Sequence, residues 1–240
     1  MDSPVLPFFA EPVREYTSKC AGRPVAVLRA GCLAPTGELG LDQLRASGAD
    51  FTITTADTDH PAVRAITGEA PAGTIIGDLR TAPLRPRTFD IVHCGLLLER
   101  VSSVEVVLDR LTGSLRPGGL LLLRIADRDC AAGLLDRRLP KAARRALWRR
   151  FHPGTPGPFP AVYEPVVSVR GMQGYALMRG LVIAARTTGQ SEPLVADRVT
   201  RTARGMCALI SWLTRGRVAA DHDQLLYVIR KPEDRFARVV

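Results

Sequence analysis

Two short apolar runs, separated by about one helix length, constrain the fold of this chain most strongly. The runs span residues 89–94 and 120–125, and turn-forming residues precede each of them. Unbroken apolar runs of this length are typical of strands covered on both faces of a sheet. The segment 102–115 between them has apolar residues at helical steps of three and four: Val104, Val107, Leu108, Leu111 and Leu115. The sequence therefore predicts a strand–helix–strand unit with parallel strands, its helix capped by Ser102 or Ser103.

The rest of the chain alternates short strand-like and helix-like segments in the same manner. We expect further strands at residues 24–28, 51–55, 74–76, 181–186 and 225–230. We expect helices at residues 11–20, 41–47, 61–66, 131–151, 169–178 and 199–213, with residues 1–8 as an arm and a break at Pro140. This order fits one doubly wound, mostly parallel seven-stranded α/β sheet. Residues 1–240 are expected to form a single domain, in which 131–170 form a basic helix and a proline-rich insertion.

The cysteines and the apolar segments bear on the cellular compartment. The five cysteines are odd in number and widely scattered, which argues against a disulfide framework and against Cys-x-x-Cys metal spacing. No run approaches the roughly 20 apolar residues that span a bilayer, and residues 1–9 lack the basic region of a secretory signal. We therefore expect a cytoplasmic protein that binds no metal.

The stretch from residue 77 to 126 also carries a family resemblance. It contains Gly-Asp at 77–78, Phe-Asp-Ile-Val at 89–92, Leu-Leu-Leu-Glu-Arg-Val at 96–101 and Leu-Arg-Pro-Gly-Gly at 115–119. In this order and spacing the motifs resemble those of class I S-adenosylmethionine-dependent methyltransferases, over roughly residues 22–126. The resemblance implies a Rossmann-like methyltransferase fold with strands six and seven as an antiparallel edge pair. It also implies S-adenosylmethionine as the cofactor and a helix at 11–20 that lies over the cofactor pocket.

The loop after the first strand departs from the family's glycine-rich motif. Only Gly31 and the neighbouring Cys32 fit the motif, whereas Arg29 stands where the family usually has an acidic residue. Leu33 and Pro35 stand at the positions of the second and third glycines, which normally let the backbone approach the ligand. Two interpretations remain open: a remodelled cofactor loop, or a degenerate loop that no longer binds the cofactor.

Three further residues at strand ends match positions that hold the cofactor in the family. The resemblance implies that Asp57 accepts both ribose hydroxyl protons, that Asp78 accepts from the adenine amino group, and that backbone near Cys94 approaches the cofactor. The structural alternatives are a turn residue at Asp57 beside a helix cap at Asp59, a solvated turn carboxylate at Asp78, and simple packing of Cys94.

Methyl transfer to an oxygen or nitrogen can require a base, and the candidates are His152, Glu99 and Tyr163. Glu99 and Arg100 fall where relatives often show Glu-His near the substrate, although the pair could equally begin the next helix. His152 and Tyr163 belong to a proline-dense loop at residues 152–170. Such a loop suits substrate binding, but it also suits a structural excursion whose His and Tyr are packed.

A dense run of positive charge is the remaining feature, in a chain whose formal net charge is +9. Residues 137–150 hold seven cations and no acid: Arg137, Arg138, Lys141, Arg144, Arg145, Arg149 and Arg150. A solvated helix face, a phosphate- or carboxylate-bearing substrate, and an anionic membrane surface with Trp148 at the interface all fit this run. Nucleic acid ranks last, because the aromatic content is only 5%.

The function predicted from the sequence is methyl transfer from S-adenosylmethionine to a small-molecule or lipid-linked acceptor. The alternative is a non-catalytic protein of the same fold that binds a partner or an anionic membrane surface through the basic helix. Asp57 and Asp78 favour the enzyme, whereas the missing glycines favour the alternative.

Overall fold

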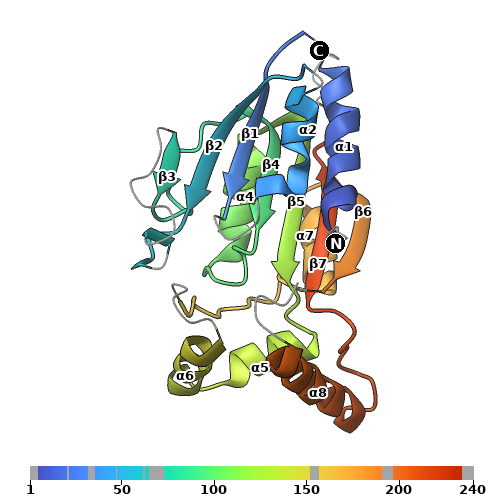
Figure 1. Cartoon of the computed structure of the whole chain (residues 1–240). Helices are drawn as coiled ribbons and strands as arrows, with labels where there is room; N and C mark the ends of the chain where they lie inside the picture. Colours follow the sequence, from blue (N-terminus) through green and yellow to red (C-terminus); the bar gives the residue numbers. More distant parts are fainter. Residues whose placement is uncertain are drawn as a thin grey trace.

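A seven-stranded sheet forms the centre of the molecule. The structure is a computed structural model, and it describes residues 5–20, 22–31, 36–46, 48–61, 63–64, 73–151, 157–190 and 197–233. The strand order is β3-β2-β1-β4-β5-β7-β6 (Figure 1). The strands are β1 (Val25–Ala30), β2 (Phe51–Asp57), β3 (Thr74–Ile76), β4 (Phe89–Gly95), β5 (Leu115–Ala126), β6 (Val182–Gly189) and β7 (Gln224–Arg230). β1 to β5 pair in parallel, and β7 is antiparallel to both β5 and β6. The predicted doubly wound, mostly parallel sheet is therefore confirmed, together with its antiparallel edge pair.

Helices cover both faces of the sheet and also its carboxyl edge (Figure 1). They are α1 (Val5–Lys19), α2 (Leu41–Ala46), α4 (Val104–Ser114), α5 (Ala131–Arg138), α6 (Lys141–Phe151), α7 (Val169–Met178) and α8 (Asp197–Leu213), and a 3₁₀ turn spans Thr36–Leu39. α1 and α2 pack on one face, while α4 and α7 pack on the other. α5, α6 and α8 lie beyond the carboxyl ends of the parallel strands, with the predicted break at Pro140 between α5 and α6. None of the described helices is long and apolar enough to cross a membrane.

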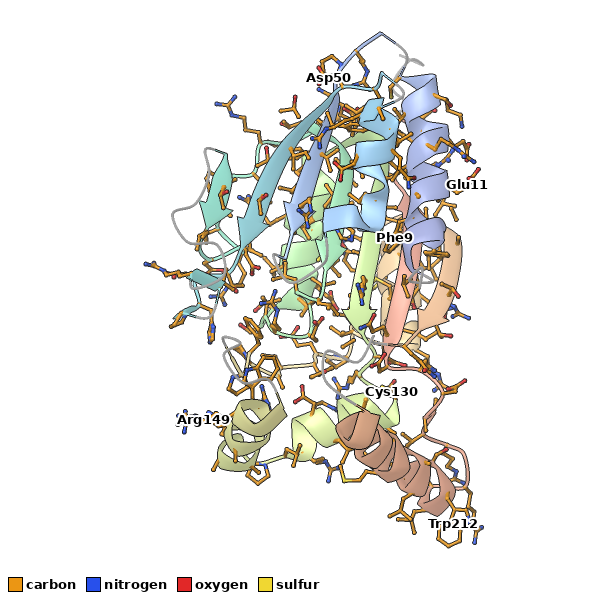
Figure 2. All side chains as sticks on the ribbon, in the orientation of Figure 1. Phe9, Glu11, Asp50, Cys130, Arg149 and Trp212 are labelled. Carbon is orange, nitrogen blue, oxygen red and sulfur yellow. The ribbon has the colours of Figure 1, made fainter. Side chains whose placement is uncertain are left out.

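The N-terminal helix differs from the prediction in both length and position. α1 begins at Val5, and Phe8, which we assigned to an arm, is partly buried against the cluster under this helix. Phe9 and Val13 are fully buried in one cluster with Val25 and Val27 of β1. Figure 2 shows Phe9 on the side of α1 that faces the sheet. α1 therefore covers a face of the sheet rather than the carboxyl edge, where the resemblance implied it would lie.

The glycine pair after Pro117 does not form the turn that the sequence suggested. β5 begins at Leu115, which pairs with Phe89, and a register shift follows between Phe89 and Ile91. A Cβ on Gly119 would lie 2.8 Å from the Asp90 carbonyl oxygen, so the two strands approach too closely for any side chain there. The segment is therefore an irregular start of β5, which is longer than predicted.

Asp90 of β4 joins several elements at the amino edge of the sheet. Its fully buried carboxylate accepts hydrogen bonds from Arg23 at 2.7 and 2.9 Å, from Arg116 at 2.7 Å and from the Ala26 amide at 2.9 Å. The Tyr16 hydroxyl of α1 adds a longer contact of 3.2 Å. Burial alone would raise the pKa of Asp90, but these donors hold it below its usual value.

The N-terminus of α4 is capped from a distant segment. Ser103 does occupy the N-cap position, but its φ is 56° and its side chain makes no capping bond. The Glu164 carboxylate accepts from the Ser103 amide at 2.6 Å and from the Val104 amide at 2.8 Å. Glu164, which belongs to the proline-dense loop at residues 152–170, thus satisfies two amides that a helix start leaves without partners.

Replacing Glu164 by Ala should destabilise the protein by about 1–3 kcal/mol, because two helix-end amides lose a charged acceptor. Urea unfolding measures the effect. Ser103→Ala is the matched control and should change the free energy of unfolding by less than about 0.5 kcal/mol, since the serine hydroxyl makes no capping bond. Equal losses in the two variants would contradict this account of the cap.

Candidate functional site

Two adjoining cavities lie at the carboxyl edge of the sheet. The cap cavity, of about 440 Å³, lies between the ends of β4 and β5 and the covering helices α5 and α6. The strand-end cavity, of about 310 Å³, lies at the ends of β2 and β3. Arg100 and Pro160 line both cavities, so a ligand in one would lie beside a ligand in the other. Ligands of open parallel sheets bind at this edge.

Gly31 follows β1 at a point where the backbone leaves no room for a side chain. Its φ is 94°, and a Cβ there would lie 2.2 Å from the Gly95 carbonyl oxygen at the end of β4. Only glycine satisfies both constraints. Arg29 belongs to β1 itself and lies in register with Thr55 and with His93. Cys32 lies outside the described residues.

Asp57 is the last residue of β2 and is fully buried. One Arg100 nitrogen, Nη2, lies 3.5 Å from each carboxylate oxygen, and the Thr58 amide donates to Oδ1 at 2.6 Å. Arg100 also donates to the Leu96 carbonyl oxygen at 2.6 Å. The structure thus brings Asp57 together with Arg100, which the sequence placed in a separate motif. Asp59 is exposed and pairs with Arg64 at 2.6 Å.

Asp78 directly follows β3 and lines the strand-end cavity. Its carboxylate is partly exposed and pairs with Arg80, with distances from 2.7 to 3.0 Å. These hydrogen bonds lower the pKa of Asp78 to about 2, so the carboxylate is ionised at neutral pH.

Glu99 enters the cap cavity from the connection between β4 and α4. Its side chain is buried, and its Oε2 has no hydrogen-bond partner among the described residues. Burial raises the pKa of Glu99 to about 7. Its carbonyl oxygen accepts from the Val162 amide at 2.9 Å and from the Tyr163 amide at 3.2 Å, which fixes the loop alongside it.

Tyr163 lies on the same side of the cavity and is also buried. Its φ of 47° is unusual for a bulky residue, and Arg128 donates to its carbonyl oxygen at 2.9 Å. Burial and the carboxylates of Asp136 and Glu99 raise the pKa of Tyr163 far above its usual value, so the hydroxyl keeps its proton. The structure therefore brings Glu99 and Tyr163 together, whereas His152 lies outside the described residues.

Cys94 is inside the core rather than in either cavity. It is fully buried in the cluster that α4 and α7 form against the sheet. Burial raises the pKa of the Cys94 thiol well above its usual value.

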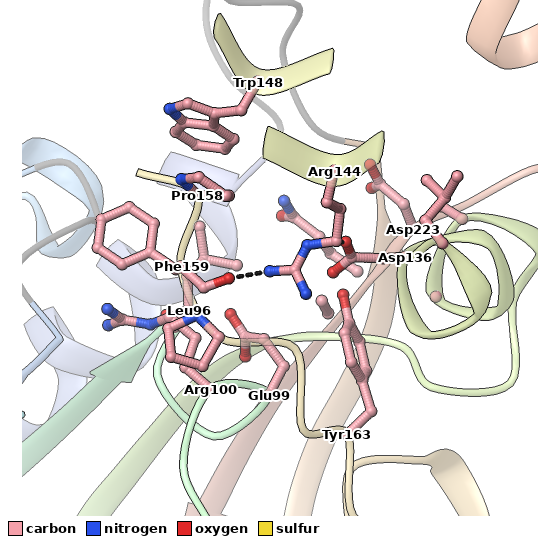
Figure 3. Close-up of a pocket in the computed structure, with 16 residues that line it drawn as sticks. Leu96, Glu99, Arg100, Asp136, Arg144, Trp148, Pro158, Phe159, Tyr163 and Asp223 are labelled. Carbon is pink, nitrogen blue, oxygen red and sulfur yellow. Dashed lines mark hydrogen bonds and ion pairs between the residues drawn. The ribbon is translucent and has the colours of Figure 1, made fainter. Parts of the chain in front are cut away.

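The sequence analysis did not single out Asp136 and Phe159, which line the cap cavity, and considered Arg144 and Trp148 only as part of the basic run. Arg144 pairs with Asp136 at 3.2 Å and donates to the Phe159 carbonyl oxygen (Figure 3). Trp148 packs edge-on against the Phe159 ring, with centroids 6.0 Å apart. These contacts depend on α6 folding back over the strand ends, which no local sequence pattern signals. Among the described residues, no group of three or more His, Cys, Asp or Glu side chains could hold a metal ion.

Comparisons with known proteins agree with this geometry. Residues 29–123 match the model of a family described as a methyltransferase domain. The fold is similar to that of an S-adenosylmethionine-dependent methyltransferase from Mesorhizobium loti, with 16% identity, 92% of this chain and 96% of that chain covered, and a TM-score of 0.50. It is also similar to a chain in the complex between the Haloferax volcanii Trm112 methyltransferase activator and the putative methyltransferase. The identity is 14%, the match covers 93% of this chain and 91% of that chain, and the TM-score is 0.50. No curated protein matches significantly.

Replacing Glu99 by Gln should change how stability depends on pH. The carboxyl keeps its proton up to about pH 7 when folded but only to about pH 4.3 when unfolded. Between these values the folded state binds more protons, so wild-type stability falls as the pH rises. We expect E99Q to exceed wild type in free energy of unfolding by up to about 3 kcal/mol at about pH 8, with little difference near pH 4.3.

Urea unfolding at the two pH values measures this effect. Glu105→Gln, which changes an exposed carboxylate on α4, is the matched control and should follow wild type at both. A difference between E99Q and wild type that is the same at both pH values would contradict the raised pKa.

Proposed function

We propose that the chain is a class I S-adenosylmethionine-dependent methyltransferase, which transfers a methyl group from S-adenosylmethionine to an acceptor in the cap cavity. The observation that carries this proposal is the pair of adjoining cavities at the carboxyl edge, which share Arg100 and Pro160. A cofactor in one and an acceptor in the other would lie side by side, and alignment is the main requirement of methyl transfer.

We propose that Gly31, Asp57 and Asp78 hold the cofactor, with Cys32 and the backbone of Cys94 beside it. S-adenosylmethionine supplies a methyl group already activated by its sulfonium. Gly31 supports the proposal because its backbone is open to close approach. Asp57 supports it because a buried carboxylate at this strand end can accept two hydroxyl protons. Asp57 is already bonded to Thr58 and lies near Arg100, so these neighbours would share the carboxylate with the ribose.

We propose Glu99 as the group that takes the acceptor's proton. Its Oε2 is buried and has no partner in the part of the chain that the structure describes, and its pKa near 7 suits proton transfer at neutral pH. Tyr163 keeps its own proton in this environment, so we assign it a positioning role beside Glu99. His152 stays a candidate base from its place in the sequence.

S-adenosylhomocysteine should raise the melting temperature, because a ligand that binds only the folded state stabilises it by mass action. By calorimetry, Asp57→Ala should weaken binding by about 1.5–3 kcal/mol, the range for lost hydrogen bonds to a charged group. Asp57→Asn serves if the alanine variant does not fold. Asp42→Ala, an exposed carboxylate on α2, is the control. No thermal shift at saturating ligand would favour the non-catalytic alternative.

We propose a second, independent role for α8 in contact with an anionic lipid surface. Met206, Leu209, Trp212 and Leu213 expose from 44 to 75% of their surface, and Figure 2 shows Trp212 at the far end of α8 from the sheet. The sequence from residue 198 to 220 holds five arginines and no acid. Exposed apolar side chains among arginines suit the headgroup region of an anionic bilayer. By contrast, α6 turns Arg144 and Trp148 inward, so it lacks the tryptophan contact that the sequence suggested.

Co-sedimentation tests the lipid contact. The protein should pellet with vesicles that contain phosphatidylglycerol but not with pure phosphatidylcholine, and added salt should release it. Changing Leu209, Trp212 and Leu213 together to Ser should weaken partitioning by at least about tenfold, because apolar area is lost from the interface. Leu177→Ser with Met178→Ser removes an equally exposed apolar pair from α7 and should behave as wild type. Equal pelleting of both variants would rule out α8 as the contact.

A further inference from the structure

We propose that the cap cavity selects a compact aromatic acceptor that offers a hydroxyl or amino group and carries no negative charge. This inference rests on the proposed function only in calling the ligand a methyl acceptor. Its evidence is the cavity itself, whose lining combines aromatic rings with a buried carboxylate oxygen to which no described residue donates a hydrogen bond.

The aromatic lining comes from three directions. Trp148 lies on α6, Phe159 lies on the loop that follows, and Tyr163 lies beside Glu99 (Figure 3). Phe159 and Trp148 already pack edge-on, and Phe159 also lies 4.9 Å from the Arg100 guanidinium carbon. Rings arranged in this way favour another flat ring over a flexible polar chain. A volume of about 440 Å³ lies toward the small end of ligand cavities, which favours a compact molecule.

The positive charges around the cavity are already bonded within the protein. Arg144 pairs with Asp136 and donates to the Phe159 carbonyl oxygen. Arg100 pairs with Asp57, outside the cap cavity, and donates to the Leu96 carbonyl oxygen. Arg144 belongs to the basic helix but is bonded to Asp136, so it is not set up as the main partner of an anionic ligand. Arg100 has one nitrogen, Nη1, that is buried without a partner among the described residues, but Figure 3 shows its guanidinium turned away from Glu99.

The negative charges lead to the opposite conclusion. Glu99, Asp136 and Asp223 all line the cap cavity, and Asp136 is paired with Arg144. Glu99 Oε2 is the carboxylate oxygen of this set that is buried without a partner among the described residues. When Glu99 is ionised, above about pH 7, a hydroxyl or an amine can donate to this oxygen, whereas a carboxylate or phosphate cannot and would meet a like charge. The cavity thus disfavours the anionic substrates that the basic helix suggested from sequence.

The chain offers a direct reporter for this test. It contains two tryptophans, of which Trp148 lines the cap cavity and Trp212 lies on the exposed end of α8. A Trp212→Phe variant therefore leaves Trp148 as the single indole. Three probes share a phenol ring and a two-carbon chain and differ mainly in charge: 4-ethylphenol is neutral, tyramine is cationic and 3-(4-hydroxyphenyl)propionate is anionic.

Fluorescence titration of the Trp212→Phe protein at about pH 8, where Glu99 is ionised, gives the affinities with and without S-adenosylhomocysteine. We expect saturable changes with 4-ethylphenol and tyramine, and binding of the propionate that is weaker by at least about tenfold. Glu99→Gln in the same background should reduce this discrimination to less than about threefold, because the amide can donate as well as accept. Glu105→Gln is the matched control and should leave all three affinities unchanged, and Trp148→Phe should abolish the signal.

The outcomes separate this inference from the proposed function. Propionate binding as tight as tyramine binding would overturn it, and so would the absence of any response to the two favoured probes. Probe binding without S-adenosylhomocysteine binding would leave the acceptor preference standing while the proposed function fails. The reverse pattern would leave the proposed function standing alone.

Discussion

The buried carboxylate of Asp90 is the interaction on which the arrangement of the sheet most depends. Burying a charge is costly unless it is paired and hydrogen-bonded. Here Arg23 and Arg116 provide the opposite charge from partly exposed positions, and the Ala26 amide completes the set. Because these donors come from either side of β4, the carboxylate ties β1, β4 and β5 together at the amino edge. The Asp of the Phe-Asp-Ile-Val motif is therefore structural, and it positions the opposite edge, where the cavities lie.

Asp57 is a second buried carboxylate, at the carboxyl edge of the sheet, and its arginine partner lies farther away. Its partner Arg100 lies 3.5 Å away, compared with 2.7 Å for the closest donors to Asp90. An uncompensated carboxylate at this depth would be strongly unfavourable, so Arg100 compensates it in the absence of a ligand. Because the contact between Arg100 and Asp57 is long, less interaction energy is lost when a ribose hydroxyl competes for the same carboxylate oxygens. Arg100 thus connects the two cavities electrostatically, which a neutral residue at this position could not do.

The sequence predicted the sheet well because its strands carry local signals. The apolar runs and the helical spacing between them located β4, α4 and the buried part of β5, and α7 has the predicted bounds. The start of α1 was missed because Phe9 is buried by β1, a partner remote in sequence. The start of β5 was missed because proline and glycine normally signal a turn, whereas here the strand pairing continues through an irregular register.

The site was predictable only where it follows from the strand ends. Asp57 and Asp78 could be located because parallel strands end at a common edge, which also brings Glu99 to the site. Trp148, Phe159 and Asp136 could not be located, because their convergence depends on how α6 folds back. Arg144 belongs to a run that reads as one cationic face, yet it turns inward to a carboxylate while Lys141, Arg145 and Arg149 are exposed. The net charge of a segment therefore does not give the charge of the cavity beneath it, because an inward cation such as Arg144 is neutralised by its own partner.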